Sequence, residues 1–163
     1  MTNRGAAFGG MLLLLAAGGT AAGQGNESPV RVDANQAVQT CLTPAERSGA
    51  VTNLNPARMR RVIACVNAAS ARQINAQLPV QIDDVTRLDR VTTQGTELTY
   101  HYSVARRARD LPARFRPAIE QSTRGHVCGE PQMVQTMRRG GVYAYRWVDA
   151  NGVPIHQIRI TGC

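Results

Sequence analysis

The clearest periodic pattern along the chain lies in residues 57–77, ARMRRVIACVNAASARQINAQ. Its larger apolar side chains recur at three- and four-residue spacings, which gathers them on one face of a helix, while the arginines fall mostly elsewhere. Pro56 suits a first helical turn, where a missing N–H costs nothing, and Pro79 prevents continuation. The pattern predicts an amphipathic helix. Its apolar positions are Met59, Val62, Ile63, Val66 and Ile74.

Two segments with the pattern of β-strands follow this helix. Residues 85–91, VTRLDRV, are rich in β-branched side chains, and residues 98–104, LTYHYSV, alternate with a period of two. Gln94-Gly95 between them is typical of a turn, so the two segments predict a β-hairpin. One face of the second strand carries Leu98, Tyr100, Tyr102 and Val104, and the other carries Thr99, His101 and Ser103.

The end of the chain predicts a second hairpin. Residues 142–148, VYAYRWV, and the return strand 153–161 flank the segment DANG, whose Asn151-Gly152 pair is a strong hairpin signal. Pro154 cannot donate a backbone hydrogen bond, so the return strand is expected at an edge, or with Pro154 at its start.

The segment between the hairpins predicts two helices. Apolar side chains recur every four residues over 111–128, and Pro117 leaves two alternatives: the helix begins near it, or kinks there. Pro131 opens a second, short helix that Gly140-Gly141 ends. The periodic positions are Leu111, Phe115, Ile119, Thr123 and Val127 in the first helix, and Met133, Val134 and Met137 in the second.

The order helix, hairpin, helix, helix, hairpin favours an α+β fold, in which a four-stranded antiparallel sheet of two hairpins carries helices on one face. We expect a single domain over residues 57–163. Residues 24–56 are expected to be flexible or partly helical. Within them, 24–40 has few large apolar side chains, 35–41 suffices for one or two helical turns, and 42–56 has the Pro, Gly and Asn content of a loop.

Residues 1–23 have the features of a secretory signal peptide. Arg4 precedes an apolar run from Met11 to Ala17, and small residues follow it as cleavage sites. The run is shorter than the ~20 residues of a membrane span, although an uncleaved anchor is the alternative. Cleavage predicts a periplasmic or secreted protein without an integral membrane segment. The first cysteine, Cys41, lies too far downstream of the leader to carry a lipid anchor.

Export makes disulfide bonds permissible, and the chain has 4 cysteines at spacings that match no CxxC or zinc pattern. Three connectivities exist. The pairing of Cys41 with Cys65 and of Cys128 with Cys163 is favoured because each bond then closes a local loop, which stabilises by ~3–4 kcal/mol in the chain-entropy model. The alternative is two or more free thiols.

The charge is strongly basic, with 19 Lys+Arg against 11 Asp+Glu and a net charge of +8, and every basic residue is arginine. Outside the cytoplasm such a surface favours anionic lipid, envelope polysaccharide or acidic proteins. Nucleic acid is not expected, because the few aromatic residues are not interleaved with the arginines. A solvated connection is the simpler interpretation of the densest basic segment, and docking to an anionic membrane surface is the functional one. Its arginines are Arg106, Arg107, Arg109, Arg114 and Arg116.

Residues that could carry catalysis do not form a recognisable set. The histidines His101, His126 and His156 lack metal-ligand spacing and are expected to be surface or satisfied structural residues. His126 is two residues from Cys128, which on a helix points the two side chains apart, and no GxSxG motif occurs. Asp83-Asp84 reads as a polar turn. We therefore expect no enzyme, cofactor or metal.

One resemblance emerges from residues 78–163. The segments LPVQIDDVTRLDRVTTQGTELTYHYSV, VCGEP and GGVYAYRWVDANGVPIHQIRITGC resemble a family of small secreted bacterial proteins of unknown function. The resemblance implies that the helix cysteine and the closing cysteine pair, here Cys128 and Cys163. That family's fold is similar to the α/β pilotins of type II secretion systems, periplasmic proteins that escort secretin subunits to the outer membrane.

The chain departs from pilotins in one respect, since those are usually lipoproteins and Cys41 is not placed for lipidation. The Cys41/Cys65 pair also lies outside the shared pattern. The leading hypothesis is an exported, non-enzymatic binding or secretion/assembly-accessory protein with a protein partner in the cell envelope. The alternative is an envelope-surface factor that binds anionic lipid or polysaccharide through Arg106–Arg116.

Overall fold

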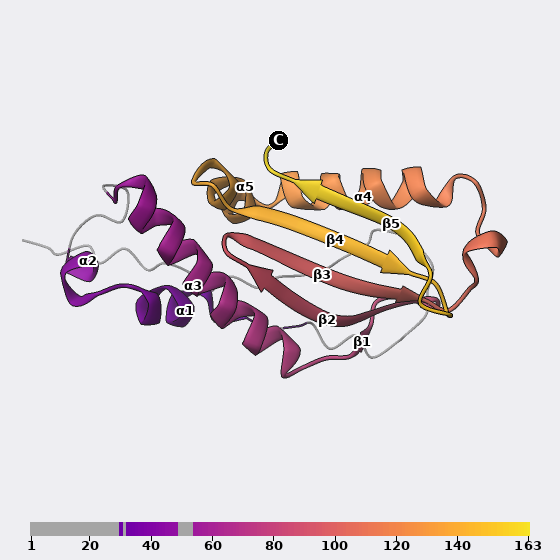
Figure 1. Cartoon of the computed structure of the whole chain (residues 1–163), viewed down its shortest axis with the longest axis horizontal. Coiled ribbons are helices and arrows are strands. Elements are labelled where there is room, and N and C mark those ends of the chain that lie inside the picture. Colours follow the sequence, from indigo (N-terminus) through magenta and orange to yellow (C-terminus); the bar gives the residue numbers. More distant parts are fainter. Residues whose placement is uncertain (1–29, 31, 49–53) are drawn as a thin grey trace, which may run out of the picture.

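The computed structural model describes residues 30, 32–48 and 54–163. The signal peptide expected over residues 1–23 lies outside them. The strands form one sheet layer, and helices lie along it (Figure 1). The elements are α1 (Ala34–Cys41), α2 (Pro44–Ser48), α3 (Pro56–Asn75), β1 (Val80–Gln81), β2 (Thr86–Gln94), β3 (Glu97–Val104), a short 3-10 helix (Ala108–Asp110), α4 (Phe115–Gly129), α5 (Pro131–Arg138), β4 (Val142–Val148) and β5 (Pro154–Ile160).

The sheet differs from the four antiparallel strands expected from the sequence. It has five strands in the order β1-β2-β3-β4-β5, and it is mixed, because β3 and β4 run parallel. The two hairpins form as expected, but α4 and α5 lie between them. A connection of this length lets β4 enter the sheet in the same direction as β3, which a short turn does not. The added strand, β1, contributes only two residues at the β2 edge.

Two helix boundaries also differ from the sequence pattern. The helix expected over 111–128 begins only at Phe115, because Leu111 precedes Pro112 and adopts the extended backbone that a residue before proline prefers. The alternative that the helix starts near Pro117 is therefore the one adopted. Residues 44–48, expected as loop, form the short helix α2.

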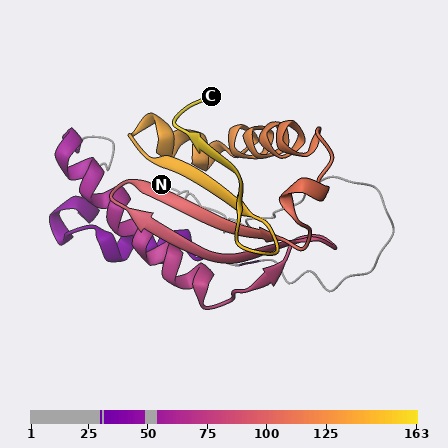
Figure 2. The same cartoon turned by 45° about the vertical axis from the view of Figure 1, so that its right-hand side comes forward.

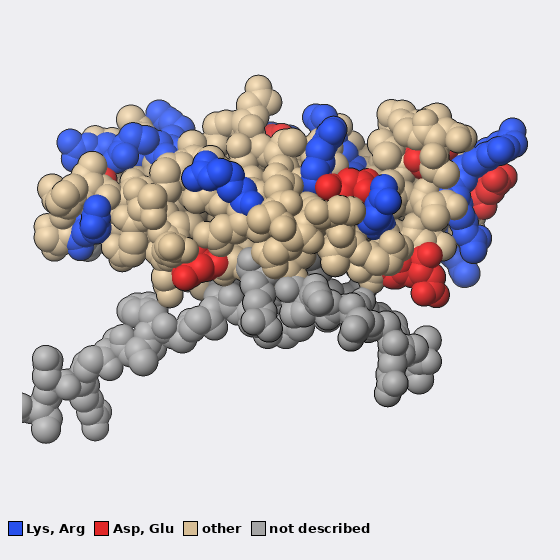
Figure 3. Space-filling view, turned by 90° about the horizontal axis from the view of Figure 1, so that it is seen from below, with Lys and Arg blue, Asp and Glu red and all other residues tan. Residues whose placement is uncertain are grey.

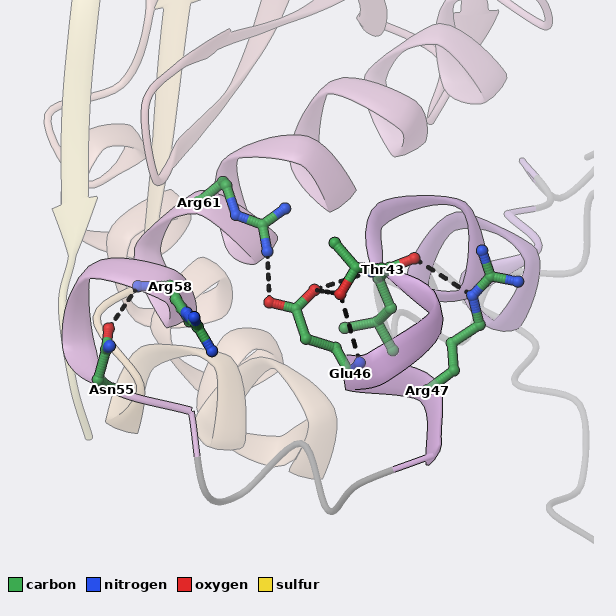
Figure 4. Close-up of polar contacts among 7 residues, drawn as sticks. Thr43, Glu46, Arg47, Asn55, Arg58 and Arg61 are labelled. Carbon is green, nitrogen blue, oxygen red and sulfur yellow. Dashed lines mark hydrogen bonds and ion pairs between the residues drawn. The ribbon is translucent and has the colours of Figure 1, made fainter.

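The helix α2 is held by a capping box, which was not among the elements predicted from the sequence. The Thr43 backbone N–H donates to Glu46 Oε2 at 2.8 Å, and the Glu46 N–H donates to Thr43 Oγ1 at 3.3 Å. Arg61 of α3 donates to the other Glu46 oxygen (Figure 4). The hydrogen bond from Arg61, followed by those from Thr43, lowers the pKa of Glu46 to about 2. A nearly buried carboxylate thus joins α2 to α3.

Helices α3, α4 and α5 pack on one face of the sheet, as the sequence pattern predicts. α3 lies by β2, α4 runs alongside β5 and α5 lies by β4 (Figures 1 and 2). The core forms between these helices and the strands. Its largest fully buried side chains are Leu88, Val104, Val127 and Ile160.

Two disulfide bonds brace this arrangement. Cys41–Cys65 joins α1 to α3, and Cys128–Cys163 joins the last turn of α4 to the residues beyond β5, each with a Cα–Cα distance of 5.7 Å. This is the local pairing that the sequence favours. The second bond holds the end of the chain against the helix that covers β5.

Candidate functional site: an aromatic sheet face with two cavities

Five rings form a continuous stack on the helix-covered face of the sheet. The parallel register places Tyr100 beside Tyr145 and Tyr102 beside Trp147. The ring centroids of these pairs lie 5.0 and 5.4 Å apart, with interplanar angles of 12° and 13°. The stack continues to His156 on β5, 6.4 Å from Trp147. Stacked rings at these separations attract beyond the area that they bury, so the face is a rigid floor.

The tyrosines of this floor are neutral hydrogen-bonding groups. Tyr100 and Tyr102 are 4% and 7% exposed. Burial, which disfavours the phenolate, raises the pKa of Tyr100, Tyr102 and Tyr145 well above its usual range. The phenols therefore keep their protons at physiological pH, and the floor offers apolar rings and neutral hydroxyl groups.

A first cavity of about 220 Å³ opens over this face, between α3 and α5. The wall on α3 includes Val66 and Ser70, and the wall on α5 includes Met133. Its floor is Leu98 and Tyr100 of β3. The lining is mostly apolar with a few polar groups, the composition typical of a ligand-binding cavity.

A second cavity, of about 150 Å³, lies further along the same face, beneath α4. Tyr102 and Trp147 form part of its floor, and Ile119 and His126 face it from the helix. The Nε2 atom of His126 is buried, and no described residue hydrogen-bonds to it. A buried polar nitrogen without a partner costs free energy, which a bound group with a matching donor or acceptor would recover.

A hydrogen-bonding contact through Glu120 joins α4 to β5 beside the second cavity. The Glu120 carboxylate accepts from Arg124 Nε at 3.1 Å, and its other oxygen lies 3.3 Å from His156 Nε2. The hydrogen bonds from Arg124 and then His156 lower the pKa of Glu120. Because His156 also stacks on Trp147, this contact couples the helix to the aromatic floor.

The basic segment singled out in the sequence lies apart from both cavities. Its five arginines, Arg106, Arg107, Arg109, Arg114 and Arg116, are all exposed. Among the described residues, only Arg109 of these forms an ion pair, with Asp110 at 3.8 Å. Basic side chains recur along the whole length of the molecule, with acids between them (Figure 3). The arginine excess is therefore spread over the surface.

The remaining candidates from the sequence make local contacts, and His126 differs from them. Asp83 Oδ1 accepts from the N–H groups of Val85 and Thr86 and so closes the turn before β2. His101 Nε2 lies 2.8 Å from Thr92 Oγ1. His126 is the exception, because the sequence predicted a satisfied or surface residue and its Nε2 is neither.

The described residues contain no cluster of three or more His, Cys, Asp or Glu placed to hold a metal ion. All four cysteines are in disulfides, so the chain has no free thiol. Within the same described part, no helix has the length and apolar character needed to cross a membrane.

The sequence alone did not predict the aromatic floor or the unpaired Nε2 atom of His126. Alternation in residues 142–148 places Tyr143, Tyr145 and Trp147 on one face, and that signal was available. Their stacking against Tyr100 and Tyr102 depends on the parallel register of β3 and β4, which sequence alone does not provide.

Comparisons with known proteins give the fold. No protein-family model matches the chain, and no curated protein matches its sequence. Three solved structures are similar. EpsS, the pilotin of the Vibrio vulnificus type 2 secretion system, has a TM-score of 0.56 and 12% identity over 64% of this chain and 92% of its own. AspS, the type II secretion system pilotin of Vibrio cholerae, has a TM-score of 0.52 and 14% identity over 64% of this chain and 93% of its own.

The third structure is PA3611 of Pseudomonas aeruginosa, described as a candidate secreted protein. Its TM-score is 0.53 and its identity is 21%, over 63% of this chain and 91% of its own. These are the two groups that the sequence motifs resemble. At such low identities the likeness shows a shared architecture, and the chain accordingly has a pilotin-like fold.

Proposed function

We propose that this chain is an exported, non-enzymatic accessory protein of secretion or envelope assembly, acting in the periplasm or outside the cell, and that its two cavities bind an apolar segment of a protein partner. The observation that carries the proposal is the pair of cavities on one aromatic sheet face. The pilotin-like fold and the secretory leader expected from the sequence support it.

A protein segment suits these cavities better than a lipid chain. Ser70 and Gln132 place polar atoms among the apolar walls of the first cavity, and His126 offers an unpaired nitrogen in the second. A hydrocarbon chain leaves such groups unsatisfied, whereas a peptide brings both apolar side chains and hydrogen-bonding groups. The occupant therefore inserts apolar side chains and makes a polar contact at His126.

Site-specific photo-crosslinking in the producing cell tests this function. A benzophenone side chain at Val66, which lines the first cavity, should capture a protein that the same side chain at exposed Thr92 of β2 does not capture. Capture should be lost in Ser70→Arg, which introduces a charge into the cavity wall, and kept in Ser103→Arg. Both serines are half-buried, but Ser103 lies on the opposite sheet face. Equal capture from both positions would contradict the proposal.

A second function, binding of an anionic lipid or polysaccharide surface through Arg106–Arg116, has one observation in its favour. All five arginines of the segment are exposed, and an exposed cationic cluster attracts anionic surfaces. Replacing all five by glutamine should abolish sedimentation with phosphatidylglycerol vesicles at low salt. Unchanged sedimentation would exclude this function.

A further inference from the structure

The sheet face opposite the aromatic floor carries a row of polar side chains across four strands. Arg90 of β2 pairs with His101 of β3, His101 with Arg146 of β4, and Arg146 with Gln157 of β5. Side chains directly opposite each other in a sheet share a face. His101 lies between Tyr100 and Tyr102, which face the core, so alternation turns the whole row to the other side.

Two arginines of this row have no ionic partner. The neighbouring charges are paired internally: Arg87 Nε lies 2.6 Å from Asp89 Oδ1, and Arg159 Nε lies 2.9 Å from Glu97 Oε2. Among the described residues, neither Arg90 nor Arg146 forms an ion pair, and both are exposed. On this sheet face, the row therefore carries unpaired positive charge between two neutralised pairs.

The row lines a hollow of about 540 Å³. This volume lies within the range of small-molecule sites. Its lining includes the polar residues Arg90, His101, Arg146 and Gln157. Asp89 also contributes to the lining, but its carboxylate is held by Arg87 at 2.6 Å. The free guanidinium groups therefore dominate the charge of the hollow.

His101 is held in place within the row. Its Nε2 lies 2.8 Å from Thr92 Oγ1, which orients the ring. Partial burial, and then the charges of Arg90 and Arg146, lower the pKa of His101, while Asp89 acts in the opposite direction. An anion placed between the two arginines would offset their effect, so the His101 ring reports on occupancy.

We propose that Arg90, His101, Arg146 and Gln157 form a binding site for the dianionic phosphate group of a small soluble molecule. Two guanidinium groups match the charge of a phosphomonoester, and the planar fork of arginine binds its oxygens in pairs. A membrane surface is a poorer match, because the paired charges on both sides of the row remove the broad cationic area that a bilayer requires. The site is independent of the two cavities on the other face.

Titration of the full chain with glycerol 3-phosphate, followed through the His101 ring resonances by NMR, tests the proposal. Saturable shifts and a raised His101 pKa in the bound state are expected. In Arg90→Gln/Arg146→Gln the affinity should fall by at least about tenfold, because two charge-assisted contacts are lost. The matched control, Arg114→Gln/Arg116→Gln, removes the same charge from exposed positions outside the hollow and should change the affinity by less than about twofold.

Three outcomes would overturn the proposal. They are the absence of saturable binding, equal weakening in the two double variants, and binding to phosphatidylglycerol vesicles without binding to glycerol 3-phosphate. Ser70→Arg, in α3 over the opposite face of the sheet, should leave the phosphate titration unchanged. Failure here is therefore separable from failure of the protein-binding function.

Discussion

Strand β4 shows how different the two faces of this sheet are. Tyr143, Tyr145 and Trp147 point into the helix-covered side, where they are at most 8% exposed. Arg146, between two of them in sequence, is exposed on the opposite face. Adjacent residues of one strand thus belong to a buried aromatic floor and to a solvated cationic row. The difference shows that the period-two alternation of a strand places buried aromatic side chains on one side of the sheet and a solvated cationic row on the other.

The largest effect on stability is expected when an aromatic ring of the floor is removed. Trp147→Ala should lower the free energy of unfolding by about 3–5 kcal/mol, because it removes a buried ring that stacks on Tyr102, Tyr145 and His156. Urea denaturation followed by circular dichroism measures it. A loss below about 1 kcal/mol would show that the floor is not a rigid, well-packed layer.

The next largest effect on stability is expected from the Cys128–Cys163 disulfide, which joins α4 to the residues beyond β5. Replacing both Cys128 and Cys163 by serine should cost about 3–4 kcal/mol in the chain-entropy model, because the bond closes a loop with a sequence separation of 35. Denaturation midpoints of the double variant and the parent provide the measurement. The matched Cys41→Ser/Cys65→Ser variant should lose slightly less, since its separation is 24. The reverse order would contradict a chain-entropy origin.

A smaller effect on stability is expected from Glu46, whose carboxylate joins α2 to α3. The hydrogen bond from Arg61, and then those from Thr43, lower the pKa of Glu46 from its usual 4.5 to about 2 in the folded chain. A depressed folded pKa stabilises above the unfolded pKa, and this contribution is lost as the pH falls from about 4.5 to about 2. Parent and Glu46→Gln should therefore differ in urea stability at pH 6, and the difference should shrink steadily as the pH falls from about 4.5 to about 2. A gap that persists in acid would mean that the ionised carboxylate is not the stabilising species.

The smallest effect on stability is expected on the open face, which is the sheet face opposite the aromatic floor. Arg146→Ala should change the free energy of unfolding by no more than about 0.5 kcal/mol, since the side chain is exposed and makes no ion pair among the described residues. The same urea titration compares it with Trp147→Ala. Similar losses for these two neighbours would remove the distinction between the faces.

Local features of the fold could be predicted from the sequence, and non-local ones could not. The hairpins β2–β3 and β4–β5 follow from alternation and turn residues that lie within one short segment. The parallel pairing of β3 with β4 joins segments on either side of two helices, and no residue between them encodes it. The stack of Tyr100 on Tyr145 depends on that pairing. The aromatic floor therefore could not be predicted, even though each of its strands was.

Two other features were present in the sequence in recognisable form. The Thr43-x-x-Glu46 spacing is the capping-box signature, but Pro44 and the surrounding Gly and Asn residues favoured a loop. The open-face row was partly visible, because alternation sets His101 apart from Tyr100 and Tyr102. Its arginines come from two other strands, so only the register of β2 and β4 against β3 brings the row together.

The central claim, that the helix-covered face receives a protein partner, is tested most directly at Trp147. The chain has 1 tryptophan, so incorporation of 5-fluorotryptophan gives a single ¹⁹F resonance in the floor of the second cavity. Adding the unlabelled partner captured through Val66 should shift this resonance in a saturable manner, in Ser103→Arg as in the parent, and not in Ser70→Arg. A resonance that stays unmoved at saturating partner, or that loses its response equally in both serine variants, would contradict the account.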